Sequence, residues 1–129
     1  MSEENVEIVR SIYARWVNGD YSVADWADAE IQYRLFDGRE TVGVEAMGNL
    51  WRDFLATWDE FTNVPDRFLD AGEGRVLVLT RFGGRSKGSG IPITDFPGAS
   101  LFTLREGKVV RLFLYPDQKK ALEAAGLEE

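Results

Sequence analysis

Helical spacing of apolar residues predicts four helices along the chain. The expected ranges are residues 2–20, 21–28, Val44 to Trp58, and Gln118 to Ala125. Gly19 supplies the glycine that commonly ends a helix, and Ser22 and Asp117 are the expected N-caps of the second and fourth helices. The third range carries apolar residues around more than half of its circumference.

Between and after these helices the pattern changes to that of strands, rich in β-branched and aromatic residues and bounded by turn residues. The expected strands are residues 30–36, 60–70, 75–85, 91–105 and 108–116. Pro65 marks the second of them as an edge strand or a bulged one. Asp37-Gly38 predicts a turn, and the glycine-rich residues 83–90 form a hairpin loop. The order predicts one α+β domain over residues 1–129 with a mainly antiparallel sheet.

Two strands lack the alternation of a sheet that has one wet face. Apolar residues run without a break over 76–79 and over 112–114. One face should pack on the helices, which are too few to wrap both sides. We therefore expect a homodimer through the outer face of the sheet, because symmetric pairing is the commonest way to cover such a face. The alternative is that part of the outer face is simply exposed.

The composition excludes several kinds of catalytic site, metal site and binding partner. The chain has 129 residues with no cysteine and no histidine, and its net charge is −7. These absences exclude thiol nucleophiles, histidine-dependent triads and the commonest metal ligands, so we expect no metal and no cofactor. An acidic chain with scattered basic residues fits neither a nucleic-acid partner nor an anionic membrane. No signal peptide or spanning segment is seen, which predicts a cytoplasmic protein.

Four stretches in this order resemble the NTF2-like superfamily, and most closely its SnoaL-like and ketosteroid-isomerase-like branch. They are IYARWVNGDYS at 12–22, AEIQYRLF at 29–36, GVEAM at 43–47 and LREGKVVRLFLYPD at 104–117. The resemblance implies a cone. In it a strongly curved sheet wraps around the N-terminal helix, with two further helices and a short C-terminal helix, and leaves a deep apolar pocket. It also implies frequent dimers, and members that are isomerases, cyclases, dehydratases, hydrolases or non-catalytic binding domains.

The steroid-isomerase site uses a carboxylate base opposite an oxyanion hole made of a tyrosine and a protonated aspartic acid. The resemblance places Ile12 at the tyrosine position, with Tyr13 one step further on the helix. It places Arg34 at the base and Ser100 at the aspartic acid. None of these positions keeps the family residue, so steroid isomerisation is not expected.

Arg34, Asp95 and Asp117 are the remaining catalytic candidates. An arginine held between carboxylates resembles the epoxide-hydrolase branch, in which these groups activate water, and Asp37 is a third possible partner. Each candidate also has a structural interpretation. Arg34 can be a rim residue with its charge in solvent, Asp95 a turn residue, and Asp117 a helix cap.

Six residues are expected to line a pocket: Tyr13, Trp16, Tyr33, Trp51, Ser100 and Tyr115. An interior rich in aromatic rings suits a flat hydrophobic small molecule, but it equally suits ordinary packing. Three hypotheses stay open. The chain is a cofactor-free isomerase, cyclase or hydrolase of apolar or polyketide-like molecules, a non-catalytic binding module, or an interaction domain filled by its own side chains.

Overall fold

The computed structural model describes residues 2–21 and 25–127. Within them lie three helices, α1 (Ser2–Val17), α2 (Val44–Leu55) and α3 (Gln118–Ala125). They also hold six strands: β1 (Ala27–Arg34), β2 (Glu40–Val42), β3 (Trp58–Gly72), β4 (Arg75–Ser86), β5 (Pro92–Arg105) and β6 (Lys108–Tyr115). The α+β class expected from the sequence is confirmed.

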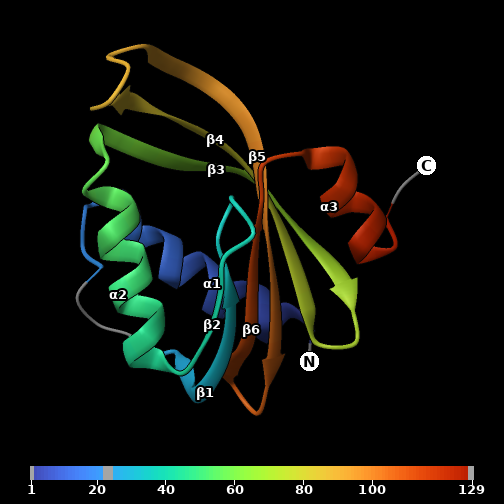
Figure 1. Cartoon of the computed structure of the whole chain (residues 1–129). Coiled ribbons are helices and arrows are strands. Elements are labelled where there is room, and N and C mark those ends of the chain that lie inside the picture. The colour runs from blue at the N-terminus through green and yellow to red at the C-terminus, as the bar shows by residue number, and fades with distance from the viewer. Residues whose placement is uncertain (1, 22–24, 128–129) are drawn as a thin grey trace.

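The six strands form one open sheet in the order β2-β1-β6-β5-β4-β3. β1 and β6 run parallel, whereas the other neighbouring pairs are antiparallel, so the sheet is mixed. β3 lies at an edge, and its pairing with β4 shifts register between Pro65 and Arg67. Pro65 had indicated one or the other of these features, and the strand has both. Such shifts bend a strand, and β3, β4 and β5 curve towards the side that carries α2 (Figure 1).

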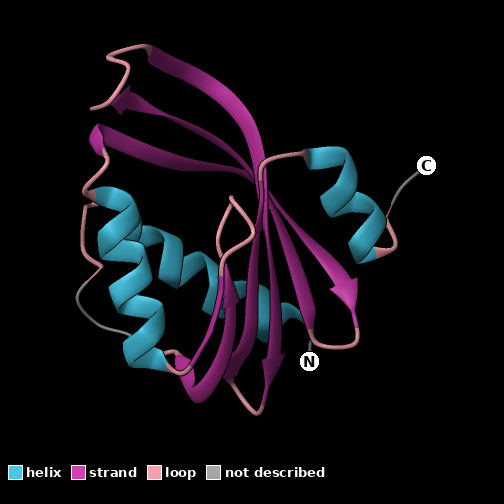
Figure 2. Cartoon of the chain, viewed as in Figure 1, coloured by secondary structure: helices cyan, strands magenta, loops and turns pink. Residues whose placement is uncertain are grey.

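Helices cover both faces of the sheet (Figure 2). α1 and α2 lie on the inner face, where residues such as Ile31, Val78 and Phe102 form the main core with them. α3 packs on the outer face, where Ala121 and Ala125 join a second apolar cluster. The expectation of helices on one face only is therefore wrong. The short α3 presents its two alanines to the outer residues of the long strands and hides part of that face.

The predicted helix over 21–28 is also wrong for the residues of this range that the structure describes. Ser22, its expected cap, lies outside the described residues. Ala27 begins β1 and pairs with Val109 of β6, and the Val109 backbone N–H donates to the Trp26 carbonyl at 2.9 Å. Trp26 is buried as the apolar pattern required. This part of the segment pairs with β6, so among the described residues α2 is the one helix between α1 and β3, where two were expected.

α2 ends at Leu55, three residues before the predicted Trp58. Thr57 closes the helix by donating from its backbone N–H and its hydroxyl to the Phe54 carbonyl, at 3.1 and 2.7 Å. Trp58 still meets Phe54, with ring centroids 6.0 Å apart, but it does so from the first position of β3. The apolar spacing that suggested a longer helix is thus satisfied by a contact between a helix and a strand. The short strand β2 was not predicted, because its three residues carry no apolar alternation.

Candidate functional site

A cavity of about 240 Å³ lies between α1, α2 and the inner face of the sheet. Its walls come from the end of α1, the segment leading into β1, one face of α2, and strands β1, β3 and β6. The lining residues are Trp16, Tyr21, Trp26, Tyr33, Val44, Glu45, Met47, Gly48, Trp51, Arg52, Asn63, Leu112 and Leu114. We call this cavity the inner pocket. Two further hollows lie at the surface, one of them on the outer face around Gln32 and Arg111.

Aromatic rings make up much of the wall of the inner pocket. Trp16 meets Trp26 edge-on, with centroids 5.8 Å apart and planes at 76°. Trp16 also contacts Tyr21 at 6.2 Å, and Tyr21 contacts Trp51 at 5.5 Å. Rings that pack on one another in this way hold each other in place and present a large apolar surface. The wall therefore suits a flat organic molecule.

Polar atoms interrupt this apolar wall at a few places. Burial raises the pKa of Tyr33 above its ordinary value, and burial likewise raises that of Tyr21. Both hydroxyls are therefore neutral over the physiological pH range. Asn63, on β3, is only 9% exposed, and its side-chain oxygen has no hydrogen-bond partner in the described part of the chain. The Trp51 indole N–H is buried and likewise has no hydrogen-bond partner in the described part of the chain.

The charged lining residues both belong to α2 and are exposed. Glu45 and Arg52 stand on either side of Gly48 along the helix. The Arg52 guanidinium donates to the Asn49 side-chain oxygen at 2.5 Å. The two charges have opposite signs, so this wall carries no net charge. Glu45 supplies the carboxylate among the described lining residues.

Tyr13 and Ser100 lie deeper than the inner pocket and do not line it. The Tyr13 hydroxyl donates to Ser100 Oγ at 2.8 Å, and the two residues are 1% and 0% exposed. The neighbouring residue on α1, Ile12, is also buried. The structure thus brings together the two side chains at or next to the positions where the resemblance implied an oxyanion hole. It uses them to tie α1 to β5.

Arg34 lies on the outer face of the sheet, because its neighbours Tyr33 and Leu35 face the core. Its guanidinium stacks over the Phe113 ring at 4.2 Å and over the Tyr115 ring at 5.2 Å. Tyr115 is packed against the cluster under α3. Neither Arg34 nor Tyr115 lines the inner pocket, and Arg34 is half-buried with its guanidinium over the two rings.

The three carboxylates offered as partners for Arg34 are engaged elsewhere. Asp37 pairs with Arg39 at 2.8 Å. Asp117 caps α3 by accepting from the Lys119 backbone N–H at 2.9 Å. The structural interpretation of Asp117 therefore holds, and its carboxylate does not line the inner pocket.

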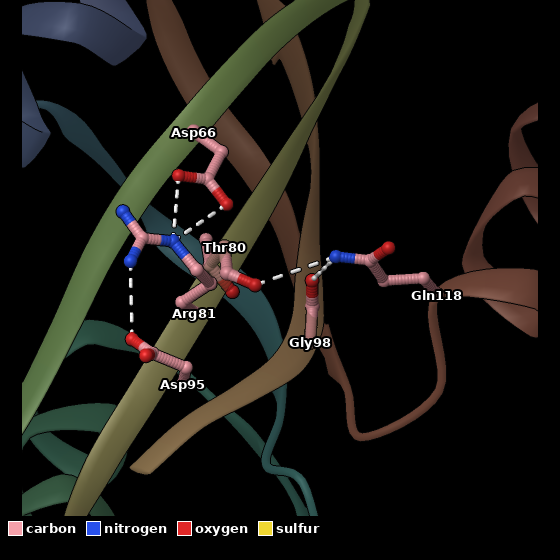
Figure 3. Close-up of polar contacts among 6 residues, drawn as sticks. All are labelled: Asp66, Thr80, Arg81, Asp95, Gly98 and Gln118. Carbon is pink, nitrogen blue, oxygen red and sulfur yellow. Dashed lines mark hydrogen bonds and ion pairs between the residues drawn. The ribbon is translucent and has the colours of Figure 1, made fainter.

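Asp95 belongs to a cluster on the outer face, shown in Figure 3. Arg81 pairs with Asp66 at 2.8 Å and with Asp95 at 3.0 Å. Beside this cluster the Gln118 amide donates to the Gly98 carbonyl at 3.1 Å, which fastens the start of α3 to β5. Asp95 also has a positive φ of 52°, a conformation that Asp tolerates better than most residues. The structure gives it backbone and ion-pair roles away from the inner pocket.

Of the six residues expected to line a pocket, Trp16, Tyr33 and Trp51 line this one. Sequence reasoning did not single out Asn63 or Gly48. Gly48 carried a signal in the sequence, because it is a glycine on the apolar side of a predicted helix, whereas the inward direction of the polar Asn63 is seen only in the structure. Either pattern is unfavourable for folding alone, and such exceptions often belong to binding sites.

The described residues contain no group of three or more acidic, histidine or cysteine side chains arranged to hold a metal ion. Among the helices described, none combines the length and the apolar character needed to cross a bilayer.

Solved structures similar to this chain share its fold. A proposed SnoaL-like polyketide cyclase from Jannaschia sp. CCS1 matches with a TM-score of 0.77 and 19% identity, over 99% of this chain and 95% of that one. A protein of ketosteroid-isomerase-like fold from Catenulispora acidiphila DSM 44928, in complex with trimethylamine, matches with a TM-score of 0.72 and 21% identity, over 95% and 94%.

TerC, crystallised with polyporic acid, matches with a TM-score of 0.75 and 16% identity, over 95% of this chain and 98% of that one. No curated protein sequence gives a significant match. The sequence profile of the SnoaL-like domain matches residues 9–112, which is most of the chain and includes the second half of α1, all of α2 and nearly the whole sheet. The chain therefore belongs to the SnoaL-like domain family.

Proposed function

We propose that this protein binds a small, flat, mainly apolar organic molecule in the inner pocket, which forms the interior of a cone-like chamber. The observation that carries the proposal is the aromatic wall built by Trp16, Tyr21, Trp26 and Trp51 around an open volume. Apolar pockets with a few well-placed polar groups are the usual form of small-molecule sites. Two structures of the same fold were obtained with small organic molecules, trimethylamine and polyporic acid.

Gly48 gives this proposal a second support. A glycine in the middle of a helix costs about 0.5–1 kcal/mol relative to alanine. Gly48 lies within α2 and lines the inner pocket, and a β-carbon there would meet only the flexible end of Arg52, at 3.4 Å. Packing therefore does not require glycine at this position. The missing side chain instead leaves room in the pocket.

Titration with a panel of neutral aromatic, terpenoid and polyketide-like compounds tests the proposal, with tryptophan fluorescence as the readout. Three tryptophans line the inner pocket, so a bound molecule should change their emission in a saturable way. A flat response to every compound of the panel would contradict the proposal.

Catalysis without a cofactor is the second candidate, and Glu45 is the observation in its favour. Its carboxylate lines the inner pocket and could take or return a proton in an isomerisation, cyclisation or hydrolysis. Glu45→Gln keeps the shape of the side chain and removes the base. If the protein is an enzyme of this kind, the variant should bind its substrate and fail to turn it over. Equal turnover by both forms would remove Glu45 from the mechanism.

We further propose that the part of the outer face left free by α3 pairs with a second copy of the chain. Acidic Asp28 and Glu30 lie there beside basic Arg105, Lys108 and Arg111, so a two-fold arrangement can place unlike charges opposite one another. Sedimentation at micromolar concentration should give a dimer that dissociates at high salt. A monomer at every salt concentration would contradict this pairing.

A further inference from the structure

Tyr33 brings a hydroxyl group to the sheet side of the inner pocket. We call this side, formed by the lining residues on β1, β3 and β6, the floor. Tyr33 lies on the inner face of β1, and its backbone is paired on both sides, with Thr41 of β2 and Leu112 of β6. Its side chain lines the pocket and is only 3% exposed. A side chain on a strand within a sheet is placed more precisely than one on a loop.

The Tyr33 hydroxyl has no hydrogen-bond partner in the described part of the chain. It differs in this from the Tyr13 hydroxyl, which donates to Ser100. It also differs from the unpaired atoms Asn63 Oδ1 and Trp51 Nε1, because those two are closed off and this hydroxyl is not. Buried polar groups without partners are rare in native proteins, and each calls for an explanation. A molecule inside the pocket can reach this hydroxyl and supply the missing partner.

What the Tyr33 hydroxyl lacks is an acceptor for its proton. Burial raises the pKa of Tyr33 above its ordinary value, so the hydroxyl keeps this proton over the physiological pH range. A ligand carbonyl can accept the proton and brings no proton of its own. A ligand hydroxyl would leave one of the two protons unpaired, because the side chains of Leu112 and Leu114 accept none and the Asn63 oxygen is closed off. An unpaired buried donor costs free energy, so a carbonyl is the better match.

The floor also favours a neutral ligand. The burial that disfavours the Tyr33 anion would equally disfavour a carboxylate placed beside it. The charged lining residues Glu45 and Arg52 are exposed and belong to α2, whereas the strands contribute neutral side chains. An ion at the floor would therefore meet no opposite charge among the described lining residues there, and burying an unpaired charge is costly.

The size of the pocket limits the molecule as well. Its volume of about 240 Å³ lies below the range of about 300–1,000 Å³ in which drug-sized ligands are held. Such a space suits a body of one or two rings. The wall of large aromatic side chains favours a flat shape for that body.

We propose that Tyr33 anchors the ligand of the inner pocket, by donating a hydrogen bond from its hydroxyl to the carbonyl oxygen of a neutral, flat compound of one or two rings. This inference rests on the proposed binding function and specifies the ligand class for the same pocket. It makes Tyr33 the residue that selects for the carbonyl group and orients the ligand with that group at the floor.

Calorimetric titration at pH 7 with three probes of similar shape tests the inference. The probes are 2-acetonaphthone, 2-isopropenylnaphthalene, in which a CH2 group replaces the carbonyl oxygen, and 2-naphthoate, in which a carboxylate replaces the acetyl group. The ratio of the ketone's affinity to the alkene's should be roughly ten-fold higher in the wild type than in Tyr33→Phe. The greater hydrophobicity of the alkene acts alike in both proteins, so it cancels from this comparison.

Tyr115→Phe is the matched control variant. It removes the same hydroxyl group from a tyrosine that packs in the cluster under α3 and does not line the inner pocket. The control should keep the wild-type ratio, and circular dichroism would establish that each variant is folded. The infrared carbonyl stretch of 2-acetonaphthone bound to the wild type needs no variant. A hydrogen bond weakens the carbonyl bond, so the stretch should lie below its frequency in cyclohexane.

Four results would overturn the inference while leaving the binding function in place. They are an equal ratio in the wild type and in Tyr33→Phe, a carbonyl stretch of the bound ketone as in cyclohexane, tighter binding of 2-naphthoate than of the ketone, and binding of panel compounds when no naphthalene probe binds. If neither the probes nor the panel bind, the inference and the proposed function both fail.

Discussion

The hydroxyl of Tyr13 donates a hydrogen bond to Ser100 Oγ at 2.8 Å, inside the core and across 87 positions of sequence. It joins the middle of α1 to β5 where neither group reaches solvent. Tyr13 is also held by edge-on contacts with Trp16 and Phe102, at 4.9 and 6.0 Å between ring centroids. The pair thus fixes the rotation of α1 and, through Trp16, the position of one wall of the inner pocket.

Tyr13→Phe should lower the free energy of unfolding by about 1–3 kcal/mol, because it leaves Ser100 buried without its partner. Ser100→Ala should cost a similar amount by leaving the Tyr13 hydroxyl unpaired. The double variant should cost clearly less than the sum, with a coupling of at least about 0.5 kcal/mol. Urea unfolding of the four proteins measures this cycle. Strict additivity would mean that the bond contributes nothing.

Burial of Tyr13 and Tyr33 predicts how stability depends on alkaline pH. Burial raises the pKa of both hydroxyls above the ordinary tyrosine value of 10.0, so the folded state keeps these protons where the unfolded chain releases them. Their stabilising contribution is therefore complete below about pH 10 and is lost as pH rises above it.

Above about pH 10, each buried tyrosine should make the free energy of unfolding fall more steeply with pH, by up to about 1.4 kcal/mol per pH unit. Tyr13→Phe and Tyr33→Phe should each reduce the slope of unfolding free energy between pH 10 and 11, and leave it unchanged between pH 7 and 9. Unfolding at a series of pH values measures the slopes. Parallel curves for the wild type and both variants above pH 10 would refute the assignment.

Asp117 should matter for stability and not for binding. Asp117→Ala removes the side chain that accepts the Lys119 N–H at the start of α3, and such a loss costs about 1 kcal/mol. Asp95→Asn is the comparison, since it breaks only an exposed ion pair with Arg81, and we expect it to change stability very little. Both should bind pocket ligands as the wild type does. A binding defect in Asp117→Ala would return this carboxylate to the functional site.

Much of the fold was predictable because it follows from local pattern. The helix spacing around Tyr13, the edge character that Pro65 gives to β3, and the cap at Asp117 are each decided by a few neighbouring residues. The segment around Trp26 was not predictable in this way. Its helix-like spacing yields to pairing with β6, whose partner residue Val109 is far away in sequence. Tertiary pairing there overrides local preference.

The candidate site was less accessible from the sequence. The aromatic residues Trp16 and Trp51 suggested a pocket wall, but a polar or charged residue shows its role only once its direction is known. Arg34 is an example, because a shift of one position along a strand moves a side chain to the opposite face. Arg34 was a candidate that proved to face outwards, and Asn63 was not a candidate but faces inwards. Asn63 lies in an ordinary-looking edge strand, and its side-chain oxygen is unpaired in the described structure.

Unpaired buried groups also predict a stability gain. Asn63→Leu and Thr80→Val each remove a buried oxygen that has no partner in the described structure, so each should raise the free energy of unfolding by about 1 kcal/mol in the absence of ligand. Thermal unfolding measures this. A clear loss of stability in both variants would show that these oxygens have partners after all, such as bound water.

The most direct test of the central claim, that the inner pocket is a binding site, is ligand titration of two variants at one position. Gly48→Phe should fill the pocket from α2, and Gly48→Ala should leave it open and stabilise the helix by up to about 1 kcal/mol. For any compound that quenches the tryptophan fluorescence of the wild type, we expect unchanged binding to Gly48→Ala and none to a folded Gly48→Phe. Equal binding by both variants would place the ligand elsewhere and contradict the account.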